Sequence, residues 1–247
     1  MKLNAENILQ LLKKLPADST IKTWWLAYSG GVDSQVLLHL LSETNLDVRA
    51  VYIDHGLQAE SKQWAEHCAR SCQQLNIPFQ VISVNAKAET GESPEASARH
   101  ARYKALATLV EDYHCLLTAQ HQDDQSETFL LQLLRGAGAA GLAAMPFCDE
   151  FSSGMHMRPL LEFTQQQILT YANQHQLSWV EDPSNKDDRY DRNYLRNQIM
   201  PMLKQRWSAI DQTISTVAKQ QAENKHLLEY YAAAELKHIN AAIDSLP

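Results

Sequence analysis

The chain alternates short apolar stretches with longer stretches of helical periodicity, and this alternation limits the folds open to it. Four apolar or β-branched stretches predict strands, at 22–28, 47–54, 79–84 and 114–119. Helical patterns predict helices at 2–15, 33–43, 59–75, 94–112 and 124–135. Strands that alternate with helices indicate βαβ units, in which helices cover both faces of a parallel sheet. We therefore expect an α/β fold with a doubly wound, mostly parallel sheet.

The pattern changes after about Pro146. The glycine-rich segment 136–141 predicts a loop, and residues 155–161 predict an edge strand. Residues 164–175 predict a short helix, and residues 193–206 predict a helix that is interrupted near Pro201. Residues 208–244 contain neither glycine nor proline, and their apolar residues recur at helical spacing. We expect one long helix there. A linker toward a further domain and a dimerising helix both remain open.

Composition excludes several classes of protein. Hydrophobic residues make up 45% and charged residues 21% of the 247 residues, as in an ordinary globular chain. No apolar stretch approaches the length of a membrane span, and residues 1–14 lack the apolar core of a signal peptide. The four cysteines form no C-x-x-C pair, so we expect no iron–sulfur or zinc-ribbon site. Free cysteines fit a protein of the reducing cytoplasm. With a net charge of -7, binding a nucleic-acid partner would need a local basic patch or a region outside this chain.

A glycine pair between the first strand and the following helix is the strongest local signal. The segment consists of Ser29, Gly30, Gly31, Val32, Asp33 and Ser34. Two glycines let the backbone approach a ligand and adopt positive φ, and the helix would direct unpaired N–H groups toward that ligand. Neither a Walker A loop nor a dinucleotide-binding loop has this sequence. We expect a phosphate-binding turn. The alternative is a plain tight turn with Asp33 as the helix cap.

Polar residues follow two further predicted strands, at the end where open α/β sheets bind ligands. Asp54 and His55 follow the second strand and would face the crevice of the phosphate loop, unless they form only an exposed turn. Four titratable residues follow the fourth strand: His121, Asp123, Asp124 and Glu127. Their carboxylates would suit Mg²⁺, which prefers oxygen ligands. A helix-capping pair formed by Asp124 and Glu127 is the alternative.

The arginines of interest fall in three groups. Arg99 and Arg102 share one face of the predicted third helix, where they would bind phosphate or remain solvated. Arg158 precedes Pro-Leu-Leu, and Arg192 and Arg196 lie one helical turn apart. The densest basic cluster consists of Lys186, Arg189, Arg192, Arg196, Lys204 and Arg206. Acidic residues are interleaved with it, so an RNA-contact patch and a mixed-charge surface both remain open.

Six groups of residues, in this order, resemble the motifs of the tRNA(Ile)-lysidine synthase family. They are SGGVDS, DHGL, EASARHARY, HQDDQSET with LLRGAGAAGL, RPLL, and EDPSNKDDRYDRNYLR. The first marks the wider PP-loop superfamily of N-type ATP pyrophosphatases, and the last two distinguish lysidine synthases within it. The resemblance runs from about Trp24 to Leu203 and implies an adenine nucleotide alpha hydrolase-like fold.

The resemblance also implies an activity. Such an enzyme uses ATP and Mg²⁺ to adenylate the C2 oxygen of the wobble cytidine in tRNA-Ile with anticodon CAU. The ε-amine of free L-lysine then attacks C2, which gives lysidine, AMP and pyrophosphate. In this interpretation residues 1–206 form the catalytic domain, and residues 207–247 form a helix that leads to a further tRNA-binding region. We expect a cytoplasmic enzyme without a membrane partner, and a homodimer remains open.

The resemblance assigns roles to individual residues. The ATP phosphates would be held by residues 29–34, with Asp54 and His55 in the nucleotide crevice. The implied catalytic residues are Asp33, His121, Asp123 and Asp124. The implied Mg²⁺ ligands are Asp33, Asp123, Asp124 and Glu127. The residues expected to contact phosphate, tRNA or lysine are Arg99, Arg102, Arg158, Arg192 and Arg196.

Two positions depart from the family pattern. Gln120 stands where the family usually has histidine, and Gln58 stands where it usually has arginine. No family contact is therefore assigned to either residue. Two other functions remain open: a PP-loop tRNA thiolase, which usually needs the cysteine pairs that are absent here, and an ATP-binding module without catalytic activity.

Overall fold

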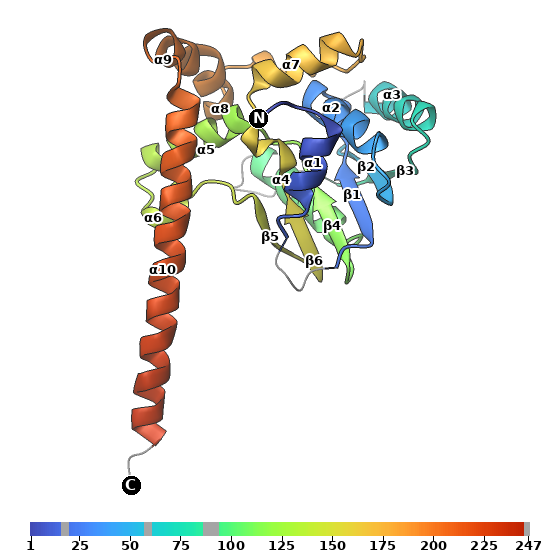
Figure 1. Cartoon of the computed structure of the whole chain (residues 1–247). Coiled ribbons are helices and arrows are strands. Elements are labelled where there is room, and N and C mark those ends of the chain that lie inside the picture. Colours follow the sequence, from blue (N-terminus) through green and yellow to red (C-terminus); the bar gives the residue numbers. More distant parts are fainter. Residues whose placement is uncertain (16–19, 57–60, 86–93, 245–247) are drawn as a thin grey trace. The chain divides into compact units, whose positions relative to one another are not determined.

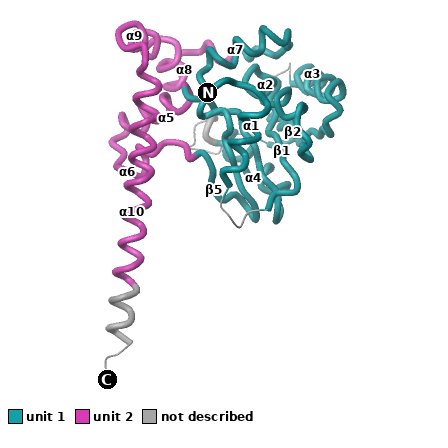
Figure 2. Tube along the Cα trace, in the orientation of Figure 1, with its two compact units in different colours: residues 1–122, 147–183 teal, residues 123–146, 184–247 magenta. Residues whose placement is uncertain are grey.

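The computed structural model describes residues 1–15, 20–56, 61–85 and 94–244. The chain forms two compact units, each built from two stretches of sequence (Figure 2). The first contains residues 1–122 and 147–183, and the second contains residues 123–146 and 184–247. Among the described helices, none has the length and apolar character needed to span a membrane. The domain boundary expected at 206/207 stays a prediction.

The first unit contains a six-stranded sheet in the order β3-β2-β1-β4-β6-β5 (Figure 1). Its strands are β1 (Thr23–Ala27), β2 (Val48–Asp54), β3 (Phe79–Ser83), β4 (His114–Leu117), β5 (Cys148–Phe151) and β6 (Gly154–Met157). All neighbouring pairs are parallel except β5 and β6, which are antiparallel. The expected doubly wound, mostly parallel sheet is therefore confirmed.

Helices pack on both faces of this sheet. They are α1 (Ala5–Leu12), α2 (Val32–Ser42), α3 (Ser61–Gln74), α4 (Pro94–Ala107) and α7 (Gln165–Gln174). Successive strand residues point to opposite faces, so Leu26 and Trp25 of β1 enter different cores. Leu26 packs with residues of α1, α2, α3 and α7, whereas Trp25 packs with Leu106 of α4. A sheet buried on both sides explains why its central strands read as continuous apolar runs.

The second unit is helical. It contains all but the first residue of α5 (Gln122–Leu134), α6 (Ala139–Leu142), α8 (Asp191–Tyr194), α9 (Met200–Arg206) and α10 (Ile210–Asp244). Phe129 of α5 packs against Ile214 and Ala218 of α10, which forms the apolar core of this unit. The expected long terminal helix is thus observed as α10, and part of its apolar face is covered by α5 and α6.

The structure corrects three local expectations. Strand β6 is not at the edge of the sheet, because β5 pairs with its outer side, and the chain after β6 forms a 3-10 turn (Pro159–Glu162). The glycine-rich loop contains the short helix α6, which begins after Gly138. Helix α4 ends at Ala107, five residues before its expected end.

The expected interruption near Pro201 is a π-helical turn (Leu195–Ile199). This turn widens the helix just before a residue that cannot donate a backbone hydrogen bond.

Candidate active site

The turn between β1 and α2 has the geometry of an anion site. Gly31 is the N-cap of α2, and the N–H of Gln35 donates to its carbonyl oxygen at 2.9 Å. The Ser34 hydroxyl donates to the same carbonyl at 3.0 Å and lies 3.1 Å from the Ser29 hydroxyl oxygen. The first N–H groups of α2 have no partner within the helix, and the helix dipole is positive at this end. Both features favour a bound phosphate.

Gly30 cannot be replaced here without strain. Its φ of +82° lies in the left-handed region, and a Cβ atom would lie 2.9 Å from the Cys68 sulfur of α3. Its carbonyl oxygen accepts a hydrogen bond from the N–H of Val180 at 2.9 Å, so the segment after α7 braces the turn. The turn is therefore packed against two other parts of the first unit.

Asp33 lies in the first turn of α2, two residues after the N-cap, so the alternative in which it caps this helix is wrong. Its Oδ1 is 3.6 Å from the Nε2 of His121, which follows β4. The chain runs from β1 to β2 and β3 on one side of the sheet, and then returns to β4 on the other side of β1. Open α/β sheets bind ligands where the strand order reverses in this way. The structure thus brings together Asp33, His121 and the phosphate turn.

Asp54 and His55 lie at the end of β2, as expected. The Asp54 Oδ1 accepts a hydrogen bond from the N–H of Gly56 at 2.9 Å, and Gly56 has a φ of +63°. Asp54 therefore closes the turn after the strand. Burial, followed by the nearby Arg102, lowers the pKa of His55. Their role in binding nucleotide stays a prediction, and Gln58 lies outside the described residues.

Arg99 and Arg102 of α4 both lie beside one aromatic ring. Their guanidinium carbons are 4.9 Å and 5.6 Å from the ring centre of Tyr103, within the range of cation–π attraction. The phosphate-binding role of the two arginines is untested. Tyr103 also lies near His156, with ring centres 6.0 Å apart.

Arg158 is buried and bonded to a histidine that the sequence did not single out. Its Nη2 lies 3.1 Å from the Nδ1 of His156, whose Nε2 lies 2.7 Å from the Thr118 hydroxyl. A guanidinium only donates, so Nδ1 accepts and Nε2 carries the hydrogen. Burial, then Arg158 and Arg99, lowers the pKa of His156 from 6.5 to about 3. Arg158 thus orients a neutral imidazole at the end of β4. The spacing of His156 in β6 and Arg158 just after it was the available sequence signal.

In the second unit, two carboxylates hold two arginines. The Nε atoms of Arg192 and Arg196 lie 2.8 Å and 2.7 Å from the carboxylate oxygens of Glu127. Their Nη2 atoms lie 3.1 Å and 2.9 Å from the Oδ1 of Asp124. Asp124 lies inside α5, so its alternative role as a helix cap is wrong. Arg192 and Arg196 were expected to contact phosphate, tRNA or lysine. They lie beside Asp124 and Glu127, which were expected to bind Mg²⁺. Both roles stay predictions.

Asp123 belongs to a second group of charges in the same unit. Lys204 of α9 bonds to Asp123, and its Nζ lies 2.8 Å from the Oδ2 of Asp211. Burial would lower the pKa of Lys204, but the two carboxylates outweigh it, so the pKa is raised. Asp211 was missed in the sequence because a single aspartate in a long helix carries no pattern. Arg189 pairs with Asp187, so the basic cluster is interleaved with its own counter-charges.

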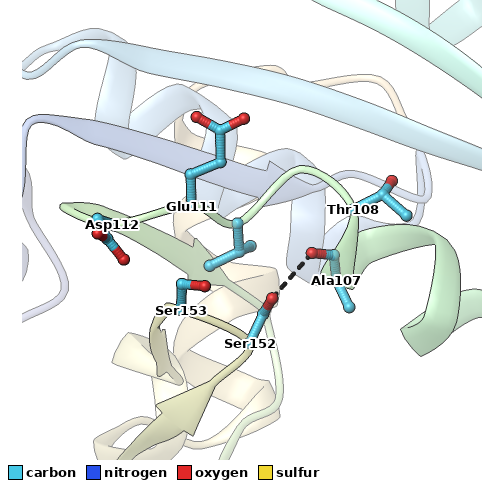
Figure 3. Close-up of a pocket in the computed structure, with 7 residues that line it drawn as sticks. Ala107, Thr108, Glu111, Asp112, Ser152 and Ser153 are labelled. Atoms are coloured by element: carbon cyan, nitrogen blue, oxygen red, sulfur yellow. Dashed lines mark hydrogen bonds between the residues drawn. The ribbon is translucent and has the colours of Figure 1, made fainter.

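A shallow pocket of the first unit lies elsewhere. It is lined at the end of α4 and at the β5–β6 turn by Ala107, Thr108, Val110, Glu111, Asp112, Ser152 and Ser153 (Figure 3). The Ser152 hydroxyl donates to the Ala107 carbonyl at 3.1 Å. Residues 107–112 precede β4, whereas the phosphate turn follows β1, which runs parallel to β4. The pocket therefore lies at the amino end of the strands, away from the phosphate turn.

The profile of an ATP-binding PP-loop domain matches residues 3–203. The chain belongs to the PP-loop family. It is 44% identical over 224 residues to a tRNA(Ile)-lysidine synthase of Methylococcus capsulatus, covering 89% of this chain and 51% of that protein. It is 48% identical to the proteins of that name from Pectobacterium atrosepticum, covering 83% and 47%, and Vibrio cholerae, covering 86% and 49%. The expected resemblance is confirmed, and this PP-loop chain spans about half the length of these relatives.

A solved PP-loop structure supports the fold. It is the U34-tRNA thiolase NcsA from Methanococcus maripaludis, described with its [4Fe-4S] cluster. The TM-score is 0.72 at 16% identity, over 88% of this chain and 78% of that one. This likeness concerns the fold alone. The cysteines of the present chain are free thiols, and burial raises the pKa of Cys68 to about 12.

We expect Gly30→Ala to destabilise the chain by about 1–3 kcal/mol, because its φ and the contact with Cys68 both resist a Cβ atom. Gly31→Ala is the matched control. Its Cβ would meet only the Ser29 hydroxyl oxygen at 3.5 Å, so we expect a cost below about 1 kcal/mol. Urea unfolding measures both. Equal losses of stability would contradict the packing argument.

Glu127→Gln should lower the free energy of unfolding by about 1–3 kcal/mol, because the buried carboxylate accepts bonds from two arginines. Asp187→Asn removes the charge that pairs with Arg189, whose side chain is exposed, and should change the unfolding midpoint much less. Thermal and urea unfolding of the two variants test this. If Asp187→Asn lowered the free energy of unfolding as much as Glu127→Gln does, burial of the Glu127 carboxylate would not explain its contribution to stability.

The low pKa of His156 predicts a pH dependence of stability. The His156 imidazole takes up a proton less readily in the folded state than in the unfolded state. The contribution of neutral His156 to the free energy of unfolding is therefore complete above pH 6.5 and is lost as pH falls toward 3. His156→Gln should therefore flatten the decline of the unfolding midpoint between pH 6.5 and 4. His226→Ala, at an exposed position of α10, should keep the wild-type profile. Parallel profiles for His156→Gln and the wild type would exclude His156 as a source of the decline.

Proposed function

We propose that this chain activates the wobble cytidine of tRNA-Ile with anticodon CAU and joins it to lysine. ATP would adenylate the C2 oxygen, with release of pyrophosphate. The lysine ε-amine would then form a bond to C2, and AMP would leave with the oxygen. The observation that carries the proposal is the meeting of the phosphate turn, Asp33 and His121 at the reversal of the sheet, in a chain whose relatives are named lysidine synthases.

The first unit supplies the chemistry that ATP binding needs. The N–H groups at the start of α2 and the hydroxyls of Ser29 and Ser34 would bind phosphate oxygens. His121, 3.6 Å from Asp33, would donate a hydrogen bond to a phosphate or move a proton. Positioning and electrostatics would supply most of the catalysis, because adenylation needs little covalent work from the protein.

Mg²⁺ would neutralise charge as pyrophosphate leaves. Each of the proposed ligands is a carboxylate, which provides the oxygen donors that this ion prefers. Asp33 is the strongest candidate, because it lies in the first turn of the helix that follows the phosphate turn. Asp123, Asp124 and Glu127 hold basic side chains, so they would bind a metal only after exchanging those partners.

The carboxylates of the second unit suit the lysine step. Asp123 and Asp211 together hold the ammonium group of Lys204, and this group is chemically like the ε-ammonium of free lysine. The substrate amine must lose a proton before it attacks C2, and a carboxylate beside it would accept that proton. Arg99, Arg102, Arg158, Arg192 and Arg196 remain the proposed contacts to phosphate or tRNA.

Incorporation of radiolabelled lysine tests the proposal. The substrate is an unmodified tRNA-Ile transcript with anticodon CAU, supplied with ATP and Mg²⁺. A transcript with uridine at the wobble position is the control and should receive no lysine. Asp33→Asn should reduce transfer by about 100-fold or more, because it replaces a carboxylate proposed to hold the Mg²⁺ that neutralises the phosphates. Asp187→Asn, at a surface ion pair, should retain activity.

Other outcomes distinguish the alternatives. Release of pyrophosphate that depends on the tRNA, without lysine transfer, would limit the proposal to the adenylation step. ATP binding with neither reaction would favour a binding module. Lysine transfer that survives unchanged in Asp33→Asn would contradict the role assigned to Asp33.

A further inference from the structure

The ends of two helices in the first unit bring three metal-binding side chains together. His39 and Glu43 lie at the end of α2, and His175 lies at the end of α7. Each offers one nitrogen or carboxylate oxygen, and these three atoms lie within 4.8 Å of one another. The group contains no residue of the phosphate turn and none of the arginines discussed above.

Regular secondary structure holds this group. His39 and Glu43 are four residues apart, so they project from one face of α2 on successive turns. Helix α7 packs against α2, and its C-cap residue is His175. The ring centres of His39 and His175 are 4.9 Å apart. The two rings are therefore presented by helices that are already packed together.

Tyr171 orients both histidines. Its hydroxyl lies 2.9 Å from the Nδ1 of His39, and its ring stacks on His175 with centres 4.1 Å apart. When that hydroxyl accepts the Nδ1 hydrogen, the Nε2 lone pair of His39 is available to a metal. A neutral imidazole is the form that binds metals.

The local field also favours a cation. Glu43 is the C-cap of α2 and His175 is the C-cap of α7, so two helix C-termini end at this place. Each C-terminus carries a partial negative charge, which attracts cations within the last turn. The carboxylate of Glu43 adds a full negative charge.

We propose that His39, Glu43 and His175 form a surface site for zinc that joins the ends of α2 and α7. Two imidazoles and one carboxylate are the donors that Zn²⁺ accepts, whereas Mg²⁺ prefers oxygen ligands. Ligand atoms around tetrahedral zinc lie about 3.3 Å apart. The exposed side chains of Glu43 and His175 would close the remaining distance by changing rotamer. Water would take the fourth position.

This site is separate from the phosphate turn. Asp33 and His39 are six residues apart on α2, which corresponds to about 9 Å along the helix axis. Zinc would brace the far end of the helix whose first turn holds the proposed phosphate contacts. The proposal does not depend on the proposed lysidine chemistry, so either can fail alone.

Zinc titration of the untagged, metal-stripped chain tests the proposal. Isothermal calorimetry should give one site per chain. His175→Ala and Glu43→Gln should each weaken binding by about tenfold or more. Tyr171→Phe removes only the hydroxyl bonded to His39 and should weaken binding by about 10-fold to 100-fold. His226→Ala, at an exposed histidine of α10, should bind zinc as the wild type does.

Two further readouts keep the test independent of folding defects. Zinc should raise the melting temperature of the wild type but not that of His175→Ala, which replaces an exposed side chain. Co²⁺ in place of zinc should absorb in the visible without the strong near-ultraviolet band of a thiolate complex. No bound zinc, equal affinity in the wild type and His175→Ala, or a thiolate band would each overturn the proposal.

Discussion

The turn from β1 into α2 is the constraint on which the rest of the first unit depends. The chain must leave a buried strand, reverse within a few residues and begin a helix whose first N–H groups have no partner within the helix. Gly30 makes this possible with a left-handed backbone, and the same residue leaves room for Cys68. The apolar strand, the glycine and the cysteine of α3 are therefore one packing unit, and the shape of the turn depends on all three.

Charge pairing plays the corresponding part in the second unit. Its apolar core is small, formed around Phe129, Ile214 and Ala218. Beside it, carboxylates of α5 hold basic side chains of α8, α9 and the π-helical turn between them. Ion pairs that lose water need close geometry to be favourable, and several short contacts supply it here. The residues that stabilise this unit are thus also those whose chemistry suits a charged substrate.

Sequence reasoning reached the features that depend on local order. A glycine pair between a strand and a helix predicts a phosphate turn, and parallel strands predict that residues after β1 and β4 meet, as Asp33 and His121 do. It did not reach β5, whose polar sequence reflects an edge strand held by one neighbour. Sequence reasoning also could not pair Glu127 with Arg192. A carboxylate predicts that its partner is basic, but it does not indicate which of the many arginines that partner is. The fold of each unit decides that choice.

The division of the chain has a consequence for synthesis on the ribosome. Glu127 leaves the peptidyl-transferase centre 65 residues before Arg192. At about 5–20 residues per second, this interval lasts about 3–13 s. The last strand of the sheet and the last residue of the first unit, 183, are both made within this interval. Helix α5 must wait in water with its carboxylates hydrated. Burial of these carboxylates can therefore follow only once the arginines that they hold have been made.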